Sequence, residues 1–435
     1  MKQLKIFLLM GLSLFWMTAQ AASLQIQSWH TTKGAKVMYV YAPGIPMVDL
    51  QISFDAGSAR DGQQWGVANM TAAMLSAGTS HHSENAISDT FNRYGAVYGQ
   101  AVERDMATFS LRTLTRKENY QASVQLFSEI LGFPSFPQDV FQREQSNLLE
   151  ALKQKKTKPS VIASETFWHA LYGDHPYAHP VSGTEQTVKT LTPKALKRFY
   201  QRYYTAKNAT LAIVGDVNLS QAKQLAEKVT QYLPKGTQPA PLPPVKAVTK
   251  AQTLVKSFPS SQTYYYLGQE GVKRGDPDYY ALFLGNHLLG GAGFASMLMQ
   301  TVREDRGLVY SVYSYFVPMK QPGPFIIGLS TKNASAKAAD QVVQKTLKAF
   351  LKGQFTEAKL QAIKDNLIDG FPLRFDSNQK IVGYLSMIGF YNLPTDYLQT
   401  FPKKIAALTK ADVLAAWRKH IHPKRMIKVM VGQPK

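Results

Sequence analysis

Two segments of this sequence, half a chain apart, follow the same pattern. Residues 191–215 and residues 408–432 both begin with Leu-Thr and end with Val-Gly, and they match without a gap. Each reads as an amphipathic helix with aromatic residues on its apolar side (Phe199, Tyr200 and Trp417), followed by a basic turn and an apolar strand. Such a repeat in a chain of 435 residues predicts two structural halves of similar fold.

Each half combines two hydrophobic periods. Val48, Leu50, Ile52 and Phe54 alternate with polar residues as in a half-buried strand. The pattern predicts a further strand at 107–113 and helices at 66–77, 84–94, 118–131, 138–155 and 192–204. Strands neighbour strands as often as they alternate with helices. We therefore expect an α+β fold with two homologous halves, each a mostly antiparallel sheet with helices packed on one face.

A change in composition marks the boundary between the halves. Residues 233–244 contain five Pro and one Gly, which favours an extended segment and excludes a helix or an inner strand. We assign the first half to residues 22–235, a Pro-rich linker to 236–252 and the second half to 253–435.

The N-terminus predicts export. Lys2 and Lys5 precede an apolar run from Ile6 to Met17, and Ala19-Gln20-Ala21 has the small-x-small pattern of a signal-peptidase site. Because this run is too short to span a bilayer of about 30 Å, we interpret residues 1–21 as a cleaved signal peptide and not as a membrane anchor. The expected location is the periplasm, with no membrane span.

Charge and cysteine content exclude several classes of partner and of catalytic chemistry. The net charge is +21, but the basic residues are spread along the chain and form no basic run with interleaved aromatics. Together with export, this argues against nucleic acid as a partner and favours a solvated basic surface. The chain has no Cys, which excludes disulfides, Cys-ligated zinc and thiol catalysis.

Several motifs together resemble the pitrilysin/insulinase family of zinc peptidases, in its processing-peptidase branch. In chain order they are Phe54–Arg60, Gly66–Thr79, Leu171–Tyr177, Pro180–Thr184, Leu289–Ser296 and Val302–Val312. One such motif is a weak signal, whereas the ordered series on a duplicated chain is a strong one. The resemblance covers nearly all of the chain after the signal peptide. It implies two homologous α+β halves hinged around a chamber that holds a peptide.

The zinc motif is where this sequence departs from the family. The family's His-x-x-Glu-His motif places two His ligands on one helical face and a general base between them. Here the first His position is Asn69, the Glu position is Ala72 and the second His position is Ala73. The third ligand, a Glu on a later helix, falls at Ala151, one residue beyond Glu150. We therefore expect no metal on this chain.

Other histidines offer a possible relocated zinc site. The segment 81–84 reads His-His-Ser-Glu, and His175 and His179 have a spacing that suits a metal on a helix. However, Pro176 and Pro180 exclude a helix there, and we expect surface histidines in both places.

The second half retains a pair of residues that the family uses. In the resemblance, Arg303 and Tyr310 would face the zinc across the chamber, bind the substrate backbone and stabilise charge on the scissile carbonyl. Gly307 is expected to end the helix that carries Arg303, and Tyr310 to open the next strand. The alternative is an ion-paired helix end, with Arg306 nearby, and a packed aromatic.

Two functions remain open. The first is a non-catalytic, substrate-binding subunit of a two-chain periplasmic zinc metallopeptidase, inactive alone, with Arg303 and Tyr310 acting in trans. Its partner would be a homologous zinc-bearing subunit, and its substrate a peptide or unfolded polypeptide. The alternative is a catalytically dead peptide-binding or scaffold protein without a protease partner.

Overall fold

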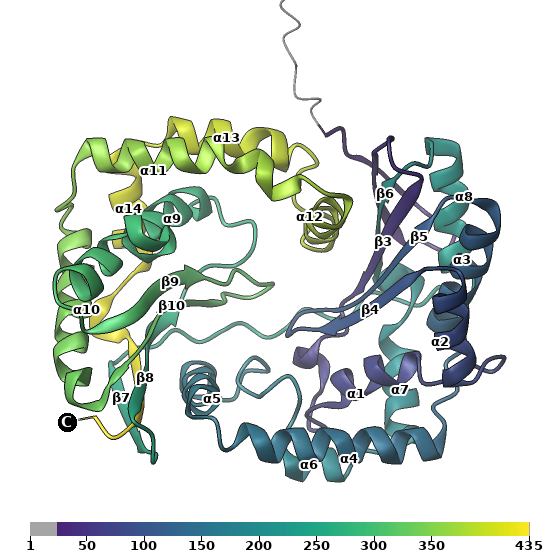
Figure 1. The fold of residues 1–435 in the computed structure, drawn as a ribbon, viewed down its shortest axis with the longest axis horizontal. Coiled ribbons are helices and arrows are strands. Elements are labelled where there is room, and N and C mark those ends of the chain that lie inside the picture. Colours follow the sequence, from purple (N-terminus) through teal and green to yellow (C-terminus); the bar gives the residue numbers. More distant parts are fainter. Residues whose placement is uncertain (1–23, 435) are drawn as a thin grey trace, which may run out of the picture.

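A computed structural model describes residues 24–434, so the predicted signal peptide lies outside the described residues. The chain forms two sheets, each with its own set of helices, on opposite sides of a central space (Figure 1). None of the helices within residues 24–434 is long and apolar enough to cross a membrane.

The first half is built on a sheet with strand order β1-β2-β6-β3-β5-β4. The strands are β1 (Gln27–His30), β2 (Lys36–Tyr41), β3 (Met47–Phe54), β4 (Val97–Val102), β5 (Ala107–Leu114) and β6 (Ala209–Gly215). The helices are α1 (Val67–Leu75), α2 (Glu84–Arg93), α3 (Lys117–Gly132), α4 (Gln138–Lys155), α5 (Pro159–Tyr172), α6 (Glu185–Lys189), α7 (Pro193–Tyr203) and α8 (Leu219–Thr230).

The second half has a sheet with strand order β7-β11-β8-β10-β9. Its strands are β7 (Gln252–Ser257), β8 (Gln262–Glu270), β9 (Val309–Phe316), β10 (Pro324–Lys332) and β11 (Ile427–Gly432). Its helices are α9 (Tyr279–Asn286), α10 (Ala336–Leu351), α11 (Glu357–Asp369), α12 (Asn378–Phe390), α13 (Tyr397–Ala407) and α14 (Lys410–His420). Two short π-helical segments, His287–Gly291 and Met299–Glu304, follow α9.

The two sheets have the same topology. The order β2-β6-β3-β5-β4 corresponds strand for strand to β7-β11-β8-β10-β9, and in both sheets only the first of these pairs is parallel. The sequence repeat occupies equivalent places, since α7 leads into β6 as α14 leads into β11. The repeated Thr caps both helices, with Thr192 accepting from the Ala195 N–H and Thr409 from the Asp412 N–H. The predicted α+β fold with two homologous halves is confirmed.

The glycines that end the repeat are also equivalent. Gly215 and Gly432 have φ angles of +149° and +148°, a region that other residues rarely adopt. A Cβ atom on Gly215 would lie 2.3 Å from the Met47 carbonyl oxygen, and one on Gly432 would lie 2.7 Å from the Gln262 carbonyl oxygen. Each glycine therefore lets a central strand end tightly against its neighbour.

We predict that Gly215→Ala and Gly432→Ala each lower the free energy of unfolding by about 2 kcal/mol or more, because strain adds to a backbone clash. Gly383→Ala in α12 is the control, since a Cβ there meets nothing within 4 Å. It should raise the free energy of unfolding by up to about 1 kcal/mol, because alanine has a higher helix propensity than glycine. Thermal unfolding monitored by circular dichroism distinguishes the three, and an unchanged Gly215→Ala variant would contradict the assigned strain.

One helix of each half also packs on the sheet of the other half. Helix α12 of the second half packs on β6, β3 and β2 of the first sheet, and α5 of the first half packs on β11 and β8 of the second sheet (Figure 1). The α12 contact includes a hydrogen bond of 3.0 Å from Gln51 Nε2 to Ser386 Oγ. The α5 contact buries Phe167 beside Tyr266. The face of each sheet opposite its own helices is thus covered by the other half, which explains why β6 is buried along its whole length.

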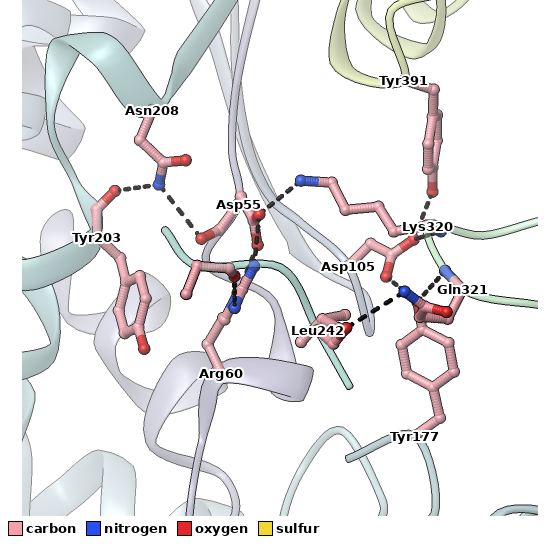
Figure 2. Close-up of polar contacts among 11 residues, drawn as sticks. Asp55, Arg60, Asp105, Tyr177, Tyr203, Asn208, Leu242, Lys320, Gln321 and Tyr391 are labelled. Atoms are coloured by element: carbon pink, nitrogen blue, oxygen red, sulfur yellow. Dashed lines mark hydrogen bonds and ion pairs between the residues drawn. The ribbon is translucent and has the colours of Figure 1, made fainter. Parts of the chain in front are cut away.

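A buried polar cluster joins the halves where the β9–β10 loop meets the first half (Figure 2). The Asp105 carboxylate accepts hydrogen bonds from Tyr177 Oη, from the Lys320 backbone N–H at 2.7 Å and from Tyr391 Oη at 3.0 Å. The Lys320 ammonium forms an ion pair with Asp55. The loop that carries Lys320 is therefore held at both its backbone and its side chain.

The linker is fixed by the same cluster. Asp55 also forms a two-point ion pair with Arg60, both contacts being 2.7 Å. Arg60 Nη1 donates to the Ala240 carbonyl at 2.7 Å, and Gln321 Nε2 donates to the Leu242 carbonyl at 3.3 Å. Residues between Thr230 and Gln252 carry no helix or strand, so these side chains hold an otherwise irregular segment.

Candidate functional site

Helix α1 holds three of the four positions of the lost zinc motif. It begins after Gly66 (φ +95°), and the buried Asp61 carboxylate caps it by accepting from the Gly66 and Ala68 N–H groups at 2.7 and 2.9 Å. Asn69 and Ala73, one turn apart, are half-buried, whereas Ala72 is 1% exposed. The helix therefore has the framework for two ligands on one face, but not the ligands.

The third-ligand position is equally unsuited. Ala151 is exposed on α4, and its neighbour Glu150 is also exposed and forms a surface ion pair of 3.4 Å with Lys153. Alanine has no donor atom, and a lone Asn is a poor zinc ligand. The residues present at Asn69, Ala72, Ala73 and Ala151 thus do not fit the zinc ion that the family's motif binds.

The other histidines do not replace the missing ligands. Across residues 24–434, the only trio of His, Asp or Glu groups close enough to hold a metal is Asp276, Asp278 and His420 in the second half. The Lys419 ammonium lies 2.7 Å from the Asp278 carboxylate, so a cation already occupies that cluster.

The expectation of surface histidines was right for His81, which is exposed, but wrong for His179. His179 is 5% exposed and stacks on Trp65, with ring centroids 5.1 Å apart. The two prolines do exclude a helix, as expected, and the resulting turn folds the imidazole inward. Burial lowers the pKa of His179, because the protein interior disfavours its charged form.

This shift predicts a contribution to stability that depends on pH. The folded protein resists protonation of His179, whereas the unfolded chain takes up a proton below about pH 6.5. His179 should therefore cost stability as pH falls below about 6.5, by at most about 1.4 kcal/mol per pH unit. Unfolding of the wild type and of His179→Gln, compared from pH 7.5 to pH 5, should show the steeper loss in the wild type. Parallel pH profiles would contradict the assignment.

The geometry of α1 predicts that a partial metal site can be restored. In Asn69→His/Ala73→His, two imidazoles would share one face of α1 at the spacing used by zinc helices. Zinc at a hundred times its dissociation constant should then stabilise this variant by about 2.7 kcal/mol and leave the wild type unchanged. Asn69→His alone is the control. The double variant should hydrolyse no peptide, because Ala72 supplies no base. Equal zinc stabilisation of the wild type would show that α1 is not the binding site.

Arg303 and Tyr310, predicted to act together, do lie together. Arg303 is in the π-helical segment Met299–Glu304, Gly307 has a φ of +60° and ends the turn, and Tyr310 is the second residue of β9. The Arg303 guanidinium carbon lies 4.9 Å from the Tyr310 ring centroid and 4.6 Å from that of Phe294. Such π-helical segments are frequent at functional sites.

These three side chains form an outward-facing group, which we name the Arg303 sandwich (Arg303, Phe294, Tyr310). Phe294 is 64% exposed and Tyr310 is 83% exposed, so neither is a core residue. The ion pair of Arg303 with its neighbour Glu304 is long, at 3.5 Å. The alternative of a packed aromatic therefore does not hold for Tyr310. Phe294 was not among the predicted site residues, although an aromatic residue inside the Gly-rich motif Leu289–Ser296 was a usable signal.

The fold and these motif positions define a duplicated zinc-peptidase framework without its own zinc ligands. Comparison with family models agrees: residues 36–185 match insulinase (peptidase family M16), and residues 190–367 match the peptidase M16 inactive domain. The chain belongs to the insulinase, or M16, peptidase family.

Some relatives of this chain are described as inactive or non-peptidase proteins, and others as zinc proteases. The chain is similar to a crystal structure described as a peptidase M16 inactive domain from Pseudomonas fluorescens, with 39% identity, 95% of this chain and 98% of that chain covered, and a TM-score of 0.91. It is 25% identical to the non-peptidase homolog YmxG of Helicobacter pylori over 95% of this chain and 94% of that protein. It is also 24% identical to the zinc protease PqqE of the same strain, over 92% and 94%.

Proposed function

We propose that this chain is the non-catalytic, substrate-binding subunit of a two-chain periplasmic zinc metallopeptidase. In this proposal, a homologous partner chain carries the zinc and the general base. This chain contributes Arg303 and Tyr310 to the composite active site. Inactivity of the chain alone follows, because Asn69, Ala72, Ala73 and Ala151 supply neither ligands nor a base.

The observation that carries the proposal is the exposure of the Arg303 sandwich. A structural Arg and Tyr pair would be buried or tied into hydrogen bonds, whereas Tyr310 is 83% exposed. The two rings hold the planar guanidinium by cation–π contacts, which limits its motion without consuming its N–H donors. The site is thus prepared to donate hydrogen bonds to a group outside this chain.

The chemistry of these two donors suits peptide hydrolysis. Attack of water on a peptide carbonyl places negative charge on the carbonyl oxygen, and donors fixed in advance stabilise that charge. The Tyr310 hydroxyl and the Arg303 N–H groups are such donors, and Arg stays charged at every relevant pH. On the partner chain, zinc would supply the activated water.

The names of the relatives favour a division of labour. One strain of Helicobacter pylori has both a relative named a non-peptidase homolog and a relative named a zinc protease. Both are matched along more than nine-tenths of their length. A pair of full-length homologues, one with and one without zinc ligands, is the arrangement that the proposal requires.

The test is reconstitution. The chain without residues 1–21 is purified alone and mixed with a homologue from the same genome that retains His-x-x-Glu-His. Zinc content and cleavage of a fluorogenic peptide library are then measured. We expect stoichiometric zinc and hydrolysis only in the mixture. Zinc with activity in the lone chain would contradict the proposal. A stable homodimer with no activity in any mixture would instead support the scaffold alternative.

Within the active mixture, we predict that Tyr310→Phe lowers kcat by about a hundredfold, because one donor to the oxyanion is lost. Arg303→Lys should also lower kcat, since an ammonium cannot reproduce the stacked guanidinium. Tyr41→Phe is the matched control, because Tyr41 is 51% exposed on a strand of the first sheet. Zinc content should be equal in all variants. An unchanged kcat in Tyr310→Phe would show that the Tyr310 hydroxyl takes no part in the reaction.

A further inference from the structure

Arg104, at the turn between β4 and β5, lies in the space between the two halves. Its guanidinium stacks on Trp168 of α5, with Cζ 3.5 Å from the ring centroid, and its Nε donates to the Tyr177 carbonyl at 2.9 Å. Burial lowers the pKa of this group to about 10. Within residues 24–434, Arg104 has no ion pair with a carboxylate.

Two cavities meet at this arginine. One, of about 490 Å³, lies between the inner face of the first sheet, the β9–β10 loop and α12, and Arg104 and Trp168 line it. The other, of about 400 Å³, is also lined by Arg104 and Trp168, and by Lys155 of α4. The Arg104 guanidinium therefore lines both cavities.

A second arginine lines the larger cavity. Arg274 precedes α9, and its Nε is buried without a hydrogen-bond partner in the described part of the chain. Its Cζ lies 5.3 Å from the Tyr391 ring centroid and 5.8 Å from that of Tyr279. Aromatic rings thus orient both arginines, and no carboxylate within residues 24–434 forms an ion pair with either one.

Asp105, Glu103 and Glu165 lie around these cavities, but none of them forms a direct ion pair with Arg104 or Arg274. Asp105 lines the larger cavity but is already engaged by Tyr177, Lys320 and Tyr391. Glu103 lines the same cavity, and Glu165 lines the smaller one, but both are exposed to solvent. Two arginines stacked beside aromatic rings therefore line these cavities without a direct ion pair to a carboxylate among residues 24–434.

We propose that the chamber between the halves binds a carboxylate group of a peptide on Arg104, with Arg274 as a second cation. A planar guanidinium presents paired N–H donors that match a carboxylate, and such charge-assisted bonds are strong where water is scarce. This names the substrate class as peptides that present a carboxylate, and it rests on the proposed function, because it takes the ligand of the chamber to be a peptide. The carboxylate comes either from an Asp or Glu side chain or from the C-terminus.

The test measures binding to the lone chain by fluorescence anisotropy of labelled peptides in matched pairs. One pair differs by Glu against Gln at a central position, and the other by a C-terminal acid against an amide. We expect the acidic member of at least one pair to bind about ten- to a hundredfold more tightly at low salt, with the difference shrinking as salt rises. The pair that shows the preference identifies the source of the carboxylate. Equal binding within both pairs overturns the proposal.

Variants locate the site. Arg104→Gln and Arg274→Gln should each remove most of the preference, whereas Arg93→Gln, on the exposed surface of α2, should keep it. Glu103→Gln should raise affinity for the acidic peptide several-fold by removing a nearby like charge. If Arg104→Gln does not fold, Arg274→Gln and Glu103→Gln still show whether the carboxylate binds at this site. A preference retained in Arg274→Gln and unchanged in Glu103→Gln overturns the site.

The assay needs no partner chain and no hydrolysis. An inactive mixture in the reconstitution therefore leaves this inference standing, and a failure here leaves the proposed division of labour standing.

Discussion

The arrangement of the two halves depends on one buried carboxylate. Asp105 is 2% exposed and receives hydrogen bonds from three segments far apart in the sequence: Tyr177 in the first half, and Lys320 and Tyr391 in the second. Burial raises the pKa of Asp105, and these three donors oppose that rise. A buried charge is costly unless it is fully paired, so loss of any one donor would weaken the join between the halves.

Helices α5 and α12, each packed on the sheet of the other half, hold the two halves around the chamber. Helix α12 covers the first sheet and α5 covers the second, so neither half can swing away without exposing apolar surface of the other. Trp168 of α5 and Ser386 of α12 both line the space between them. Both helices therefore line the chamber, with Arg104 stacked on Trp168 of α5 and Arg274 beside Tyr391, directly after α12.

Sequence patterns predicted the elements that local physics controls. The alternation from Val48 to Phe54 became β3, the region 138–155 became α4, and Gly307 ended the turn after Arg303 as expected. The exchange of α5 and α12 was not predictable, because an apolar helix face does not say which sheet it covers. For the same reason the burial of His179 was missed, since Trp65, its stacking partner, is more than a hundred residues earlier.

The site was predictable in part. The absence of ligands at Asn69, Ala72 and Ala73 is read from the sequence itself. The structure adds that the side chains of Arg303 and Tyr310 lie together. Whether positive charge lines the chamber or the outer surface could not be read from the sequence, since pairing is a tertiary property. Arg60 and Arg104 are both arginines near β-strand ends, yet the first has an ion pair with Asp55 and the second has none among the described residues.

In the proposed heterodimer, Tyr310 completes an active site on another chain. A photo-crosslinking group placed at position 310 tests this directly in the reconstituted mixture, with cross-linked peptides mapped by mass spectrometry. We expect cross-links to the partner chain near its His-x-x-Glu-His helix, and a loss of these cross-links when a peptide substrate fills the site. Cross-links only to a second copy of this chain, or to a partner surface remote from the zinc helix, would contradict it.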